Sequence, residues 1–150
     1  MMVPADNTKQ ILPAVAAAIF NDRGEILLQK RGDVNKWCIL SGHVEFGETI
    51  EEALLREIEE ETNSPARIIR LIGVYSSPDS QTYFYDDRTV HYITSYFEAQ
   101  LMSDLQADFS NSETKELRFF NTHALPEDLA LLNSNWLADA LSKRETPFIR

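Results

Sequence analysis

Two periodicities divide the chain into strand-like and helix-like segments. Short segments rich in β-branched and aromatic residues and bounded by turn-forming residues predict strands. The predicted strands are residues 14–20, 25–31, 37–40, 66–75, 90–99 and 117–120. The first two flank a turn-forming cluster at 21–24, so they are predicted to pair as a β-hairpin.

Apolar residues recur at helical spacing in two further segments. Thr49 and Glu52 match the Ser/Thr-x-x-Glu capping box, so a helix is expected to begin at Thr49 and to extend to residue 62. Asn63 follows at the position where a left-handed residue commonly ends a helix. A second helix is expected from residue 126 to about residue 143. This order of strands and helices predicts an α/β (α+β) fold with a mixed sheet covered on both faces.

Length and composition predict one globular domain. The 150 residues suffice for a single core, and without linkers or repeats we expect one domain over 1–150, with 1–10 as a flexible or peripheral segment. No apolar run approaches the roughly 18–20 residues of a membrane-spanning helix, so no membrane partner is expected. The single cysteine, Cys38, excludes an intrachain disulfide, and the expected location is the reducing cytoplasm.

The negative charge is concentrated in one stretch of the chain. Residues 45–61 hold eight glutamates and one arginine, whereas the whole protein has a net charge of −10. Binding to a nucleic-acid backbone takes clustered Lys and Arg, so no nucleic-acid partner is expected. Carboxylates at this density must be solvated or neutralised by cations.

The helical period separates the glutamates of this stretch into two groups. At about 100° per residue, Glu57 and Glu61 lie with the apolar stripe that faces the protein, and Glu60 lies beside it. Burying unpaired carboxylates is costly, and Arg56 alone cannot balance three of them. A divalent cation such as Mg²⁺ could, since it prefers oxygen ligands. The alternative is a Glu-rich helix end that simply faces solvent.

Seven residues of this region match a known motif. They fit the Nudix box, G-x5-E-x7-R-E-U-x-E-E-x-G-U with U aliphatic, and are Gly42, Glu48, Arg56, Glu57, Ile58, Glu60 and Glu61. Residues 42–64 therefore resemble the signature of the Nudix hydrolases. Asn63 and Ser64 depart from the pattern without removing a carboxylate. The resemblance implies a Nudix-type α/β/α sandwich with a mixed β-sheet between helices.

The resemblance also implies a metal site. Glu57, Glu60 and Glu61 would coordinate Mg²⁺ or Mn²⁺, with the Gly42 carbonyl as a further ligand. Glu48 would bind metal or support its ligands.

Further catalytic roles follow from the same resemblance. Arg56 would chiefly position other groups, for example by pairing with Glu60. Members of the family often carry a further acidic residue in a loop before a late strand, and Glu113 is the best candidate, with Glu116 as the alternative. The general base could be Glu57 or Glu113.

The implied function is hydrolysis of a pyrophosphate bond in a nucleoside diphosphate linked to another moiety. The substrate would be a small-molecule nucleotide: a nucleoside triphosphate, a nucleotide sugar such as ADP-ribose, or a dinucleoside polyphosphate. Candidate substrate contacts are Arg31 for phosphate and Trp37 and Tyr75 for the base. Two alternatives are a catalytically silent Nudix-fold domain that binds a nucleotide or protein, and a calcium-binding protein, although no EF-hand loop is present. A homodimer is expected only from the family.

Overall fold

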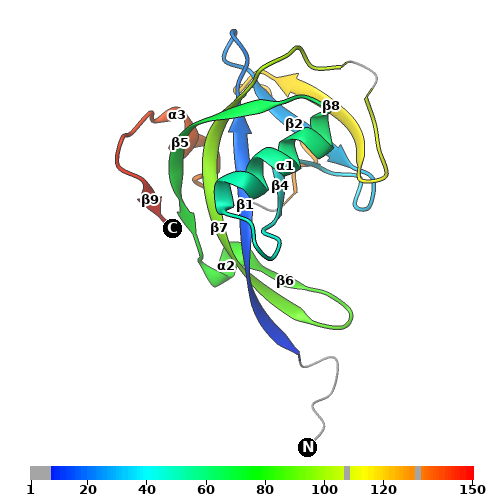
Figure 1. Cartoon of the computed structure of the whole chain (residues 1–150), viewed down its shortest axis with the longest axis vertical. Helices are drawn as coiled ribbons and strands as arrows, with labels where there is room; N and C mark the ends of the chain where they lie inside the picture. Colours follow the sequence, from blue (N-terminus) through cyan, green and yellow to red (C-terminus); the bar gives the residue numbers. More distant parts are fainter. Residues whose placement is uncertain (1–7, 107–108, 131–132) are drawn as a thin grey trace, which may run out of the picture.

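Two β-sheets form the frame of the protein (Figure 1). The computed structural model describes residues 8–106, 109–130 and 133–150. The larger sheet has six strands in the order β4-β1-β7-β5-β9, with β6 also paired to β7, and the smaller sheet has the order β3-β2-β8. The strands are β1 Lys9–Ile19, β2 Ile26–Arg31, β3 Trp37–Cys38, β4 Leu40–His43, β5 Ala66–Tyr75, β6 Thr82–Phe84, β7 Thr89–Leu101, β8 Thr114–Phe120 and β9 Phe148–Ile149. The helices are α1 Ile50–Thr62, α2 Pro78–Gln81 and α3 Trp136–Leu141.

The larger sheet is mixed, which confirms the predicted fold class. Strands β1 and β7 run parallel, with Ala14 opposite Thr94, whereas β4 pairs antiparallel with β1 and β5 antiparallel with β7. The start of β1 pairs with β7 from Lys9 onward. The rest of the segment expected to be peripheral, residues 1–7, lies outside the described residues. None of the helices within the described ranges is long and apolar enough to cross a membrane.

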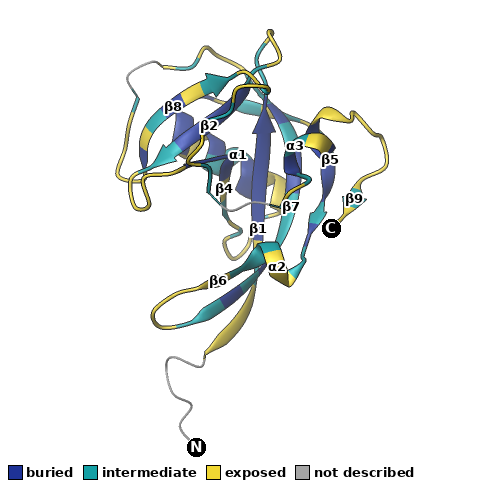
Figure 2. Ribbon diagram, turned by 180° about the vertical axis from the view of Figure 1, so that it is seen from behind, coloured by how far each residue is buried: buried dark blue, intermediate teal, exposed yellow. Residues whose placement is uncertain are grey.

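Helices cover opposite faces of the larger sheet. Alternate residues of β1 point to opposite sides, so Val15 and Ala17 join the core cluster that contains Leu54 of α1. Ala16 belongs to the cluster on the other face, which contains Trp136 of α3. Figure 2 shows β1 exposed in its first part and buried in its second part, where it runs through the centre of the molecule. Helix α1 therefore packs on one face of the larger sheet, and its outer surface faces solvent.

Helix α1 begins and ends where the sequence predicts. The Thr49 hydroxyl accepts a hydrogen bond from the Glu52 N–H (3.1 Å), and the Glu52 carboxylate accepts one from the Thr49 N–H (3.0 Å). Asn63 is left-handed with φ 56°, and its N–H donates to the Glu59 carbonyl at 2.8 Å. Asn tolerates this conformation better than most residues, so it replaces the glycine of the motif without loss of the cap. Ser64, the other departure, is buried and accepts a hydrogen bond from the Ser103 hydroxyl (3.0 Å).

Replacing Leu54 by Ala tests the packing of α1 on the sheet. Leu54 is fully buried in the core cluster, so the variant should lose about 2–5 kcal/mol in the free energy of unfolding. Urea denaturation followed by circular dichroism measures this loss. Glu59→Ala, a change on the exposed face of the same helix, is the matched control and should be nearly neutral. Equal midpoints for Leu54→Ala and Glu59→Ala would contradict the packing.

The predicted hairpin between residues 14–20 and 25–31 is wrong. Strands β1 and β2 lie in different sheets and share one isolated bridge, between Phe20 and Ile26. The reason is that both edges of β1 are occupied, by β4 and by β7. The predicted strand 37–40 is likewise two strands, because the chain passes from the smaller sheet to the larger one at Ile39.

The predicted helix from 126 to 143 is wrong in its first part. Leu129 forms a parallel bridge with Trp37, whose N–H donates to the Asp128 carbonyl (3.0 Å) and whose carbonyl accepts from the Ala130 N–H (2.7 Å). These backbone bonds hold the segment extended despite its helical spacing. Helix α3 starts only at Trp136, and residues 131–132 of the predicted helix lie outside the described residues. The short strands β6 and β9 were not predicted.

Candidate active site

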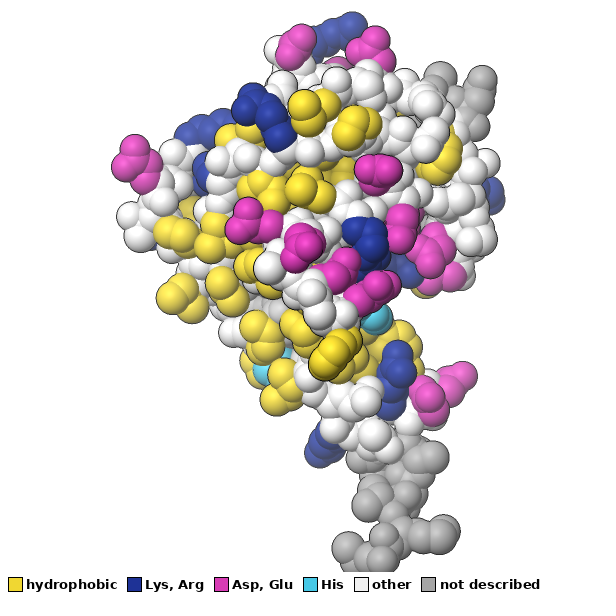
Figure 3. Space-filling view, viewed as in Figure 1, with side chains coloured by type: hydrophobic (Ala, Val, Ile, Leu, Met, Phe, Trp, Pro, Cys, Tyr) yellow, Lys and Arg dark blue, Asp and Glu magenta, His cyan; other side chains and the backbone are white. Residues whose placement is uncertain are grey.

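A close approach between α1 and β4 places the first carboxylate. A Cβ atom at Gly42 would lie 2.1 Å from the Glu57 carboxyl carbon, so the Glu57 carboxylate rests directly against the glycine. No other residue leaves this space free. Gly42 and Glu57, both residues of the motif, are therefore held together by direct contact. Figure 3 shows acidic side chains gathered on the face that carries α1.

Arg56 fixes the carboxylates around it. Its guanidinium donates to both carboxylate oxygens of Glu48 (2.7 and 2.9 Å), to Glu57 (3.0 Å) and to the His43 carbonyl (3.0 Å). The bond from Arg56 lowers the pKa of Glu48. Glu60 lies at the rim, 3.4 Å from Arg56 with 55% of its side chain exposed. Glu48 is thus already paired, and Arg56 links it to Glu57.

Glu61 is the most deeply buried of these acids. Its exposed fraction is 2%, and the Thr114 hydroxyl donates a hydrogen bond to it. Burial raises the pKa of Glu61 to about 7, and the nearby Glu113 and Glu57 contribute in the same direction. Burial also raises the pKa of Glu57. The positively charged side chains of the site are therefore too few to neutralise its carboxylates.

A loop before β8 brings Glu113 to the end of α1. The Asn111 side chain accepts hydrogen bonds from the Glu113 N–H (2.9 Å) and the Thr114 N–H (2.6 Å), and it donates to the Glu60 carbonyl (3.0 Å). Sequence reasoning missed Asn111 and Thr114. The available signal was the Asn111-x-Glu113 spacing, since Asn commonly bonds to the backbone two residues later.

A cavity of about 940 Å³ connects this acidic end with an aromatic end. Its lining includes the predicted site residues Gly42, Glu57, Glu61, Glu113, Arg31 and Tyr75. Elsewhere it is lined by Tyr83, Tyr85 and Tyr92. A volume of this size accommodates a nucleotide-sized ligand.

The predicted substrate contacts have three different outcomes. Arg31 reaches the cavity while paired with Asp33 at 2.9 Å. Tyr75 forms part of the wall, with its hydroxyl committed to Asp139. Trp37 is not among the residues that line the cavity: it is buried, with its ring against Phe120 at a centroid distance of 4.9 Å.

The remaining predicted acids lie outside the cavity lining. Glu48 and Glu60 both contact Arg56, which is likewise not among the lining residues. Glu116, the alternative to Glu113, projects from β8 and pairs with Arg118. The structure thus brings Glu113, and not Glu116, to Glu57 and Glu61.

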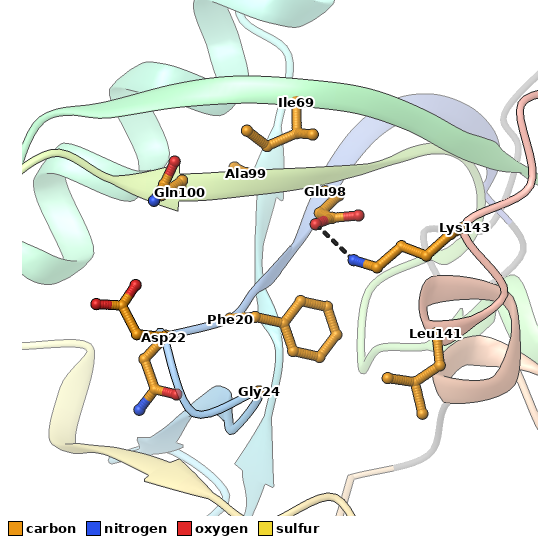
Figure 4. Close-up of a pocket in the computed structure, with 10 residues that line it drawn as sticks. Phe20, Asp22, Gly24, Ile69, Glu98, Ala99, Gln100, Leu141 and Lys143 are labelled. Atoms are coloured by element: carbon orange, nitrogen blue, oxygen red, sulfur yellow. Dashed lines mark hydrogen bonds and ion pairs between the residues drawn. The ribbon is translucent and has the colours of Figure 1, made fainter.

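A second, smaller cavity of about 370 Å³ has balanced charges. Its partly buried acid, Glu98, pairs with Lys143 at 2.9 Å and with Arg70 at 3.0 Å. Figure 4 shows Lys143 directed at Glu98 across this cavity. The larger cavity is therefore the candidate site.

The donor set of the larger cavity suits a hard divalent cation. It offers carboxylate oxygens of Glu57 and Glu61, whose pKa values are raised because their charge is poorly compensated. Across the part of the chain that the structure describes, no three His, Cys, Asp or Glu side chains yet converge on one point. Glu57 is turned to Arg56 and Glu61 to Thr114, so cation binding requires small side-chain rotations.

Comparison with known proteins identifies the family. The model of the NUDIX domain family matches residues 11–140, and the chain belongs to this family. An ADP-ribose pyrophosphatase of Methanocaldococcus jannaschii is 37% identical over 120 residues, which are 77% of this chain and 66% of that protein. The resemblance read from residues 42–64 is thereby confirmed.

Solved structures show the same fold. The crystal structure of a UDP-X diphosphatase matches with a TM-score of 0.75 at 25% identity, covering 93% of this chain and 66% of that chain. An ADP-ribose pyrophosphatase from Streptococcus suis matches with a TM-score of 0.70 at 22% identity, covering 93% of this chain and 97% of that one. This chain thus spans just under two thirds of the Methanocaldococcus protein and of the UDP-X diphosphatase.

Proposed function

We propose that the protein hydrolyses a pyrophosphate bond in a nucleoside diphosphate linked to another moiety, with a divalent metal. The observation that carries this proposal is that Glu57, Glu61 and Glu113 all line the same 940 Å³ cavity. Two of these glutamates lie on the helix of the family motif. The names of its relatives, an ADP-ribose pyrophosphatase and a UDP-X diphosphatase, support the reaction class.

In this proposal the acids of α1 hold Mg²⁺ or Mn²⁺. Glu57, Glu60 and Glu61 would be ligands, together with the Gly42 carbonyl. Glu48 would act indirectly, because its bonds to Arg56 fix the arginine that holds Glu57. A divalent ion bound there supplies charge neutralisation for adjacent phosphates and lowers the pKa of a water molecule.

The protein groups supply orientation and proton transfer. Arg31, which lines the cavity, would contact a phosphate oxygen. A carboxylate takes the proton of the attacking water, and both Glu57 and Glu113 line the cavity. Burial raises the pKa of Glu57, which makes its carboxylate a stronger base than that of an ordinary glutamate. Tyr75 would contribute its ring to the wall, since its hydroxyl bonds to Asp139.

A substrate panel tests the proposal and separates it from the silent-domain alternative. ADP-ribose, other nucleotide sugars, dinucleoside polyphosphates and nucleoside triphosphates, including oxidised ones, are incubated with Mg²⁺ or with EDTA. We expect Mg²⁺-dependent release of a nucleoside monophosphate from at least one class. Nucleotide binding without turnover on the whole panel would favour a silent binding domain.

Replacing Gly42 by Ala should lower activity without unfolding the protein. The added methyl group would overlap the Glu57 carboxylate, which must then move, and a displacement of about 1 Å can cost about 10²-fold in turnover. Steady-state kinetics measures the change. Gly32→Ala is the matched control, because its new Cβ would meet no atom closer than 3.9 Å. Equal loss in both variants would contradict the contact-based role of Gly42.

Location and assembly complete the proposal. We place the protein in the cytoplasm, where its single cysteine, the buried Cys38, stays reduced. We also propose a homodimer, which light scattering after gel filtration tests directly.

A further inference from the structure

The tyrosine-lined end of the cavity has a floor of small side chains. Ala14 and Ala16 of β1 line it and lie beside Thr94 and Tyr96 of the parallel strand β7. Alanine at two successive inward positions leaves a depression on a sheet face otherwise covered by larger groups.

Three tyrosines surround the depression. The Tyr83 and Tyr85 rings are nearly parallel, with centroids 6.5 Å apart and planes at 22°, and Tyr83 meets Tyr92 edge-on at 5.5 Å. The hydroxyls of Tyr85 and Tyr92 bond to each other (3.0 Å), and Tyr92 also bonds to His43 (3.1 Å). Two of the hydroxyls are thus satisfied within the protein, so the rings offer mainly apolar faces to the cavity.

Arg88 adds a positive charge at the rim. Its guanidinium lies over the Tyr85 ring, 5.2 Å from the centroid, and the side chain lines the cavity. Its Nε is buried and has no hydrogen-bond partner within the described residues. The turn between β6 and β7 fixes this arrangement, since the Tyr85 N–H donates to the Arg88 carbonyl at 2.8 Å. A buried donor of this kind favours a ligand with acceptor atoms.

We propose that this tyrosine slot, formed by Ala14, Tyr83, Tyr85, Arg88 and Tyr92, binds the nucleobase of the substrate. A planar ring stacks on the tyrosines, and Arg88 donates to acceptor atoms on its edge. The diphosphate then extends through the cavity to the carboxylates. The assignment rests on the proposed function, and it adds that a base, rather than the second moiety or a further phosphate, occupies this end.

The direct test is binding of nucleosides without phosphate or metal. Adenosine and guanosine are titrated into the full chain in EDTA and followed by NMR, with ribose 5-phosphate as the base-free comparison. We expect both nucleosides to bind and Tyr85→Leu to weaken them about tenfold or more, while Tyr85→Phe, which keeps the ring, retains binding. Phe84→Leu is the matched control, since Phe84 is 82% exposed and not among the cavity-lining residues. Thermal unfolding shows whether each variant is folded.

Two results would overturn the slot. One is nucleoside affinity unchanged in Tyr85→Leu. The other is tight binding of ribose 5-phosphate that Arg88→Met abolishes, which would make this end a phosphate site.

Steady-state kinetics on a substrate that the panel identifies tests the tyrosine slot separately from the proposed hydrolysis. Tyr85→Leu should raise KM about tenfold and change kcat by less than about threefold, because the ring binds ground and transition states alike. Nucleoside binding without hydrolysis of any substrate would refute the reaction and leave the slot standing. Hydrolysis with a KM indifferent to Tyr85→Leu would refute the slot alone.

Discussion

Replacing Glu57 by Gln is expected to lower kcat for pyrophosphate hydrolysis by about 10³-fold or more. The change keeps the shape of the side chain but removes a charge that the proposal uses twice, for metal binding and for proton transfer. Arg56 would retain an acceptor at this position, so the fold should persist. Steady-state turnover with saturating Mg²⁺ measures the effect.

The control for this variant lies on the same helix. Glu59→Gln removes one negative charge from the exposed face of α1 and should leave kcat within about twofold. Glu57→Gln with full metal-dependent turnover would remove the proposed mechanism. Comparison with Glu113→Gln then assigns the base, because only the base variant should lose the acidic limb of the pH–rate profile.

Replacing Glu61 by Gln should stabilise the metal-free protein at neutral and higher pH. Burial raises the pKa of Glu61 from the ordinary 4.5 to about 7, so the folded state binds this proton more tightly than the unfolded chain does. The contribution to stability is full below pH 4.5 and is lost as the pH rises to 7. Gln carries no charge to bury, so the variant should gain about 2 kcal/mol over the wild type above pH 7.

Thermal unfolding in EDTA between pH 5 and pH 8 measures this gain. The Tm of the wild type should fall relative to that of Glu61→Gln as the pH rises, by roughly 4–8 °C. Adding Mg²⁺ should raise the Tm of the wild type more than that of the variant, because the ion neutralises the buried charge. Parallel curves of Tm against pH for the two proteins would show that burial does not destabilise the charged form of Glu61.

The helix could be predicted from the sequence because its determinants are local. The capping box of Thr49 and Glu52, the left-handed Asn63 and the helical period all act within a few residues of each other. The sheet partners could not be predicted in the same way. Nothing near β1 in the sequence indicates that β7 lies parallel along its whole length, and this non-local pairing excludes the hairpin.

The site residues that lie on α1 could be predicted from the sequence. The wheel places Glu61 among apolar residues, and it is 2% exposed in the structure. Glu113 could be predicted only from the family resemblance. Asn111 positions the loop of Glu113 by bonding to the Glu60 carbonyl, and these two residues are far apart in the sequence. Trp37 is not among the residues that line the cavity, because bridge pairing with Leu129 and packing on Phe120 bury it. Composition cannot show on which side of a strand an aromatic ring finds its partners.

The central claim is that these carboxylates support metal-dependent attack of water on a pyrophosphate. Hydrolysis of the best panel substrate in ¹⁸O-labelled water, followed by ³¹P NMR with Mg²⁺ and with EDTA, tests it most directly. We expect Mg²⁺ to be required and ¹⁸O to enter one product phosphate. Turnover that persists in EDTA, or products without ¹⁸O, would contradict it.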